Sequence, residues 1–141
     1  MAKSKAEGPR RPLRSVGAVL AGFFVGAILS LGTDQILHLL KFYPPWGETT
    51  ADGPLVLATA YRILFNILGC YVTAWLAPRR PMFHALVIGW LGLVLGTLAA
   101  VATWNAVPPL GPHWYAVAIA LISLPCAWMG GFLYLRRSTK R

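Results

Sequence analysis

Long apolar runs separated by short polar segments dominate the pattern along this chain. A helix that crosses a bilayer needs about 20 mostly apolar residues. Four runs meet this requirement, at residues 15–40, 55–76, 84–104 and 114–135. The segments between them contain clusters of Pro and Gly, which end helices and favour turns. The pattern therefore predicts an all-α fold, a transmembrane four-helix bundle whose helices run up and down in antiparallel order.

The segments that flank the runs complete the domain organisation. Residues 1–14 form a basic tail, residues 15–135 form the membrane domain, and residues 136–141 form a second basic tail. The first run is longer than the apolar core of a signal peptide, about 7–15 residues, so we expect it to be retained as a helix. All but two of the 13 Lys and Arg lie in the tails or at Arg79 and Arg80. Because basic residues collect on the cytoplasmic side, we expect both termini to be cytoplasmic.

The composition changes how the net charge is interpreted. The chain is 57% apolar and 12% charged, whereas soluble domains are about 45–50% apolar and about 25% charged. A net charge of +9 would suggest a nucleic-acid partner for a soluble protein. Here the basic residues flank apolar runs, where they meet anionic lipid headgroups. The expected partners are therefore the lipid bilayer, further copies of the chain or other membrane proteins, and no nucleic acid.

Small residues recur along the runs at intervals of three and four. The series in the first, third and fourth runs are Gly22, Gly26 and Ser30; Ala85, Gly89, Gly92, Gly96, Ala99 and Thr103; and Ala116, Ala120, Ser123, Ala127 and Gly130. Small residues let the backbones of membrane helices approach closely. We therefore interpret these glycines as packing residues. Pro125, inside the fourth run, predicts a kink.

Two formal charges, Asp34 and Arg62, lie well inside the apolar runs. Such residues cost roughly 2.5–3.5 kcal/mol each on insertion scales and usually face a partner or a water-filled cavity. Each lies about 10 Å below the same end of the bundle, at a helical rise of about 1.5 Å per residue. Consecutive helices joined by a short loop are neighbours. The sequence therefore predicts an ion pair in which the Arg62 guanidinium grips both oxygens of Asp34.

Several polar residues lie near this pair in the sequence. They are Ser30, Thr33, Gln35, His38, Thr59, Tyr61 and Asn66. Among them, His38, Thr59 and Asn66 are the predicted supporting residues, and His38 follows Asp34 by one helical turn. One interpretation is an ion pair that only fixes the helix register. The other is a proton or substrate site, against which the guanidinium counts because it holds the carboxylate ionised.

Other kinds of chemistry find little support in the pattern. His38 and His113 lie near one end with Glu48 and Asp52, but their spacing is not that of a metal site. Neither a nucleophile elbow nor a P-loop occurs. Cys70 and Cys126 lie inside apolar runs, without a CxxC motif. We therefore expect no metal, no cofactor and no enzyme activity. The loops at 42–48 and 108–115, rich in Pro and aromatic residues, are expected to cap the bundle.

Six motifs distributed over nearly the whole chain carry a resemblance. They are SLGTD at 30–34, FYPPWGE at 42–48, TAYR at 59–62, APRRPM at 77–82, ATWN at 102–105 and GPHWY at 111–115. In these motifs the chain resembles uncharacterised small four-span bacterial integral membrane proteins. The resemblance implies the bacterial inner membrane and no mechanism. The chain is also similar in size to small multidrug transporters, but their acidic residue is a glutamate earlier in the first helix, so this is an analogy of fold alone.

Two functions follow from these features. The first is a non-catalytic scaffold or an accessory subunit that works by contact with other membrane components. The second is a small oligomeric transporter or channel that uses Asp34, Arg62 and Asn66. A cavity that reaches Asp34 would favour transport, whereas a closed pair would favour the scaffold.

Overall fold

The computed structural model describes residues 11–107 and 109–141, and within these ranges it contains four helices and no strand. The helices are α1 (Pro12–Leu39), α2 (Asp52–Leu76), α3 (Pro81–Thr103) and α4 (His113–Thr139). All four are long and apolar enough to cross a membrane. The predicted all-α, four-helix fold of a multi-pass membrane protein is therefore confirmed.

The helices extend beyond the predicted apolar runs at several ends. α1 begins at Pro12, inside the predicted basic tail, and α3 begins at Pro81. Proline suits the first turn of a helix because that turn leaves its N–H groups unpaired in any case. α4 continues to Thr139, into the predicted second tail. Residues 1–10 of the predicted first tail lie outside the described residues.

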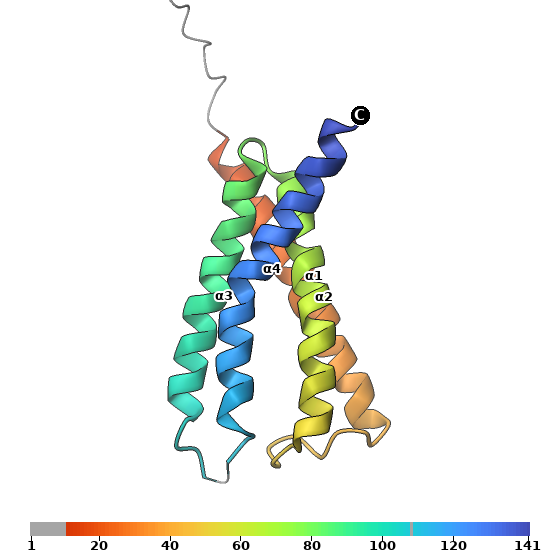
Figure 1. Ribbon diagram of the computed structural model, residues 1–141, viewed down its shortest axis with the longest axis vertical. Coiled ribbons are helices and arrows are strands. Elements are labelled where there is room, and N and C mark those ends of the chain that lie inside the picture. The colour runs from red at the N-terminus through yellow and green to blue at the C-terminus, as the bar shows by residue number, and fades with distance from the viewer. Residues whose placement is uncertain (1–10, 108) are drawn as a thin grey trace, which may run out of the picture.

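Consecutive helices pair into two antiparallel hairpins. α1 packs against α2, and α3 packs against α4 (Figure 1). α2 also packs against α4, and this contact joins the hairpins. We call the end that holds the start of α1, the α2–α3 connection and the C-terminus the terminal end. The opposite end, with residues 40–51 and 104–112, is the loop end. The hairpins diverge toward the loop end (Figure 1).

Glycine brings α1 and α2 into close contact. A Cβ atom on Gly22 would collide with the side chain of Thr73 and with the carbonyl oxygen of Gly69. The Thr73 hydroxyl also donates a hydrogen bond to the carbonyl oxygen of Ala18, 3.1 Å away. Because Gly22 contributes no side chain to this contact, the first hairpin holds its helices at short distance.

Glycine also allows close contact between α3 and α4 and between α4 and α2. A Cβ atom on Gly92 would lie 2.7 Å from Ser123 Oγ, and a Cβ atom on Gly96 would lie 3.0 Å from the Cα of Ala120. Between α4 and α2, a Cβ atom on Gly130 would lie 2.6 Å from the carbonyl oxygen of Ile67. The predicted packing role of these glycines is confirmed. α4 changes direction in its middle (Figure 1), and Pro125 lies inside this helix.

The interior is built from small side chains, and the large apolar ones face outward. The buried cluster in the interior contains Cys70, Ala74, Ala85, Ile88 and Ala127. Exposed side chains include many Leu, Phe and Trp residues, which in water would be an unusually apolar surface. This distribution is typical of helices that are solvated by lipid.

Candidate functional site

The structure brings Asp34 of α1 and Arg62 of α2 together in an ion pair, as their depths in the sequence predict. Arg62 Nη2 donates a hydrogen bond to Asp34 Oδ2, and Tyr61 Oη donates one to Asp34 Oδ1. The Asp34 side chain is buried, whereas that of Arg62 remains 30% exposed. Tyr61 bonds to Oδ1, the oxygen that a bidentate guanidinium would have bound. The predicted grip on both carboxylate oxygens is therefore wrong.

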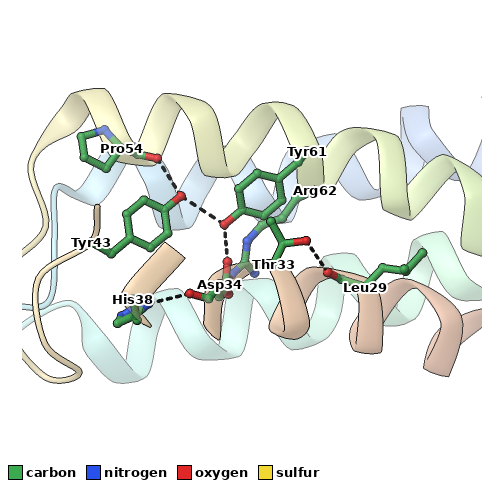
Figure 2. Close-up of polar contacts among 8 residues, drawn as sticks. All are labelled: Leu29, Thr33, Asp34, His38, Tyr43, Pro54, Tyr61 and Arg62. Atoms are coloured by element: carbon green, nitrogen blue, oxygen red, sulfur yellow. Dashed lines mark hydrogen bonds and ion pairs between the residues drawn. The ribbon is translucent and has the colours of Figure 1, made fainter. Parts of the chain in front are cut away.

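A chain of hydroxyl groups leads from Asp34 toward the loop end (Figure 2). Tyr43 Oη lies 3.1 Å from Tyr61 Oη and donates to the carbonyl oxygen of Pro54 at 3.0 Å. Burial raises the pKa of the Tyr43 phenol, which therefore stays neutral and can both donate and accept. Asp34, Tyr61, Tyr43 and Pro54 thus form one continuous series of contacts at hydrogen-bond distance. Because each hydroxyl has one hydrogen, the two tyrosines can fill two of these three contacts at a time while Asp34 is ionised.

The turn after α1 places Tyr43 in this chain. Lys41 adopts a left-handed conformation with φ of 58°. The N–H groups of Phe42 and Tyr43 then fold back to the carbonyl oxygen of Leu37, at 2.9 and 3.2 Å. This cap points the Tyr43 ring into the bundle, where 7% of the residue stays exposed. The sequence does not predict that Tyr43 belongs to the site. The signal that it offers is the position of Tyr43 directly after a helix, in a proline-rich turn.

Within the described residues, none of the three predicted supporting residues hydrogen-bonds to the carboxylate or the guanidinium. His38 Nδ1 lies 2.8 Å from the backbone oxygen of Asp34, and its ring stacks on Trp46 at 3.9 Å. The Thr59 hydroxyl donates to the carbonyl oxygen of Leu55 at 2.8 Å. Asn66 Oδ1 lies 3.9 Å from the thiol of Cys70. Helical Ser and Thr commonly bond to their own preceding turn, which explains why Thr59 turns away from the pair.

Arg62 also lines three adjoining cavities. One, of about 270 Å³, lies between the hairpins near the loop end, and a second, of about 410 Å³, reaches toward the middle of the bundle. Both are lined by Arg62, Gly96 and Ile119, so we treat them together as the inter-hairpin cleft. The third, of about 250 Å³, lies under the 40–51 loop and reaches Asp34. The ion pair therefore borders open space on several sides.

The cleft is mostly apolar, and its polar groups are few. Its members deeper in the bundle include Gly26, Ser30, Asn66, Leu95 and Ile122. The Nε atom of Arg62 is buried and has no hydrogen-bond partner among the described residues. A guanidinium offers only donors. The predicted residue Asn66 thus shares the cleft with Arg62, although the two form no hydrogen bond in the part of the chain that the structure describes.

Two contacts join the hairpins at the loop end. Trp114 Nε1 donates to Asp52 Oδ1 at 2.9 Å, and the Thr49 hydroxyl donates to the carbonyl oxygen of Pro109. On the second hairpin, the ring of His113 stacks on Trp104 at 4.0 Å. The Thr49–Pro109 bond joins the two loops and the Trp114–Asp52 bond joins the starts of α4 and α2, which agrees with the expected capping role of the loops.

The arrangement can hold a ligand that accepts hydrogen bonds, because the Arg62 guanidinium lines a cavity with mostly apolar walls. In residues 11–107 and 109–141, no group of three or more His, Cys, Asp or Glu side chains is placed to bind a metal. The search of known protein-family models, curated proteins and solved structures finds no match to this chain.

Proposed function

We propose that this protein binds a small ligand in the inter-hairpin cleft and works, in an oligomer, as a small membrane transporter or channel subunit. The observation that carries the proposal is that the Arg62 guanidinium lines three adjoining cavities, while its buried Nε has no hydrogen-bond partner in residues 11–107 and 109–141. A charge inside a membrane segment is costly and is usually retained for a function or paired for structure. Here Arg62 is paired on one side and faces open space on the other.

The proposed membrane is the bacterial inner membrane, with the terminal end in the cytoplasm. The basic residues support this orientation. Arg14, Arg79, Arg80 and the 136–141 segment lie at the terminal end, whereas Lys41 at the loop end has Glu48 and Asp52 for neighbours. In this orientation Arg62 is nearer to the outer surface than to the cytoplasm.

The chemistry of the walls defines the class of ligand. Leu55, Ala99, Ala116 and Ile119 line the cleft with apolar surface. Arg62 presents donors alone. We therefore expect a compact molecule with an apolar body and a head that bears acceptor oxygen atoms.

Cysteine labelling tests whether the cleft admits solutes. In a protein whose Cys70 and Cys126 are replaced by Ala, single cysteines are introduced as Ala99→Cys, on the cleft wall, and Leu98→Cys. Leu98 is the adjacent residue in α3, 60% exposed and outside the cleft lining. In nanodiscs, a small negatively charged methanethiosulfonate should react about tenfold or more faster with the cleft cysteine, because a thiol in hydrocarbon does not ionise. Equal rates at the two positions would contradict an open cleft.

The scaffold or accessory role remains a second proposal, and one observation favours it. Both carboxylate oxygens of Asp34 are already occupied, by Arg62 and Tyr61. A carboxylate with both oxygens bonded is also what a purely structural site requires. In that case neither of the cysteines introduced at positions 98 and 99 should react with the reagent. The protein should also co-purify with another membrane protein.

A further inference from the structure

The hydroxyl chain beside Asp34 fits two protonation states of this carboxyl group. When Asp34 is ionised, Tyr61 donates to Oδ1, and Tyr43 can donate to Tyr61. When Asp34 carries a proton, these two bonds can reverse and a third can form: Asp34 donates to Tyr61, Tyr61 to Tyr43, and Tyr43 to the carbonyl oxygen of Pro54. A hydroxyl can donate one hydrogen bond and accept others, so no donor is left unpaired in either state.

The charge of the site restricts what can enter the cleft. Arg62 and Asp34 together are neutral, so a monoanion bound at the guanidinium would leave one net negative charge in a low-dielectric region. Uptake of one proton by Asp34 would cancel this charge. Proton uptake would also free the guanidinium from the carboxylate, because a neutral carboxyl group attracts a cation only weakly.

Resting on the proposed function, we infer that the cleft binds a monoanion together with one proton, and that Asp34 is the group that accepts the proton. In the bound state the anion pairs with Arg62. The ion pair between Nη2 and Oδ2 opens, and water at the loop end supplies the proton through Tyr43 and Tyr61. Each hydroxyl passes on one proton and receives another. The net change is one anion and one proton bound, with no change in the charge of the site.

The surroundings of Asp34 single it out as the acceptor. The titratable groups that line the same cavity are His38 from α1, Arg62 from α2, Tyr43 and Glu48 from the loop, and Tyr115 from α4. Tyr61 bonds directly to Asp34. His38 bonds through Nδ1 to a backbone oxygen and stacks on Trp46. Glu48 is exposed in the loop. Asp34 is the carboxyl group in direct contact with the guanidinium that the anion would take over.

Octane-1-sulfonate is a suitable probe, because it has an apolar tail and its headgroup stays a monoanion throughout the accessible pH range. Binding to the wild-type protein in nanodiscs of zwitterionic lipid is followed by calorimetry in two buffers with different ionisation enthalpies. We expect uptake of about one proton per sulfonate bound and a dissociation constant that rises about tenfold per pH unit. Octanamide, a neutral analogue, should bind without proton uptake.

Two variants separate the roles of the residues. Asp34→Asn keeps a neutral side chain at the acceptor position, so octane-1-sulfonate should bind with no proton uptake and with an affinity that is independent of pH. Tyr43→Phe removes the last donor of the reversed chain, so it should weaken sulfonate binding while leaving octanamide binding unchanged. Circular dichroism and size-exclusion profiles equal to those of the wild type show that each variant is folded.

The outcomes are distinguishable from those of the proposed function. Sulfonate binding by the wild type without proton uptake would overturn the coupling. Absence of sulfonate binding would overturn the monoanion assignment, while labelling of the Ala99→Cys protein would decide separately whether the cleft is open. Proton uptake that persists in Asp34→Asn would assign the proton to another group and overturn the role of Asp34.

Discussion

At the scale of single residues, two neighbours in the sequence divide one carboxylate between them. Tyr61 and Arg62 follow each other on α2, and each donates to a different oxygen of Asp34. Consecutive residues of a helix point about 100° apart. The Asp34 side chain therefore lies between the side chains of Tyr61 and Arg62. Its position fixes the rotation of α1 about its axis relative to α2. Loss of any one of the three side chains leaves a buried polar group without its partner.

A double-mutant cycle tests the energy of the ion pair. Removal of one partner of a buried pair typically costs about 3–5 kcal/mol, whereas removal of both can be nearly neutral. Asp34→Asn and Arg62→Leu should each lower the free energy of unfolding, and the double variant should regain much of the loss. Denaturation in detergent measures all three. Losses that simply add would show that the two residues are not coupled.

Thr59→Val provides a matched control for this cycle. Thr59 lies one turn before Arg62 on α2, but its hydroxyl bonds to the carbonyl oxygen of Leu55. The unfolding free energy should change by less than about 0.5 kcal/mol, as for substitutions that break no buried network. A loss as large as that of Arg62→Leu would mean that Thr59 supports the pair after all, as the sequence predicts.

The residue scale also shows the limit of what the sequence can predict. The pairing of Asp34 with Arg62 follows from depth and from helix order alone, since helical rise converts residue number into distance. The contact of Tyr43 does not. It depends on the left-handed backbone conformation of Lys41, which reverses the chain. The periodicity of apolar residues in the sequence does not predict such a conformation. The predicted support of the pair by His38, Thr59 and Asn66 is wrong for a similar reason. A polar side chain can bond to its own helix or to a distant partner, and the sequence does not determine which.

At the scale of the helices, close packing depends on a few glycines and not on glycine in general. Gly22 faces Gly69 and Thr73, whereas the surroundings of Gly17 and Gly32 on the same helix are open. Sequence periodicity predicts the Gly22–Gly26–Ser30 series because these residues share a face. The helix ends are less predictable, because two helices extend past their apolar runs. α1 begins at Pro12, before its apolar run, and α4 continues to Thr139, beyond its own.

A pair of glycine substitutions tests this distinction. Gly22→Leu would drive a side chain into the backbone of α2 and should destabilise the protein by at least about 1–3 kcal/mol. Gly32→Leu adds the same side chain at a position with nothing within 4 Å and should leave the melting temperature unchanged or raise it. Thermal unfolding in detergent compares the two. Equal loss in both variants would place the helix contact elsewhere on α1.

At the scale of the whole molecule, the two ends of the bundle differ in charge. Arg136, Arg137, Lys140 and Arg141 extend the basic terminal end, and the loop end carries Glu48 and Asp52. An asymmetry of this kind directs insertion, because translocated loops are poor in Lys and Arg. The even number of helices then places the start of α1 and the end of α4 on one side.

Cysteine accessibility on intact cells tests this orientation. Glu48→Cys and Asn105→Cys, both exposed at the loop end, should react with a membrane-impermeant thiol reagent from outside. Ser138→Cys, exposed at the terminal end, should react only after the cells are opened. The background lacks Cys70 and Cys126. Labelling of position 138 on intact cells would invert the proposed topology.

The division into hairpins has a consequence for biosynthesis. Asp34 and Arg62 both belong to the first hairpin, so their charges can neutralise each other before α3 and α4 leave the ribosome. The first two helices then enter the membrane with their intramembrane charges paired, and the second hairpin needs only to dock against them through α4 and α3. Residues 1–77 and 78–141, translated as separate polypeptides, should therefore insert independently and assemble into a complex that co-purifies.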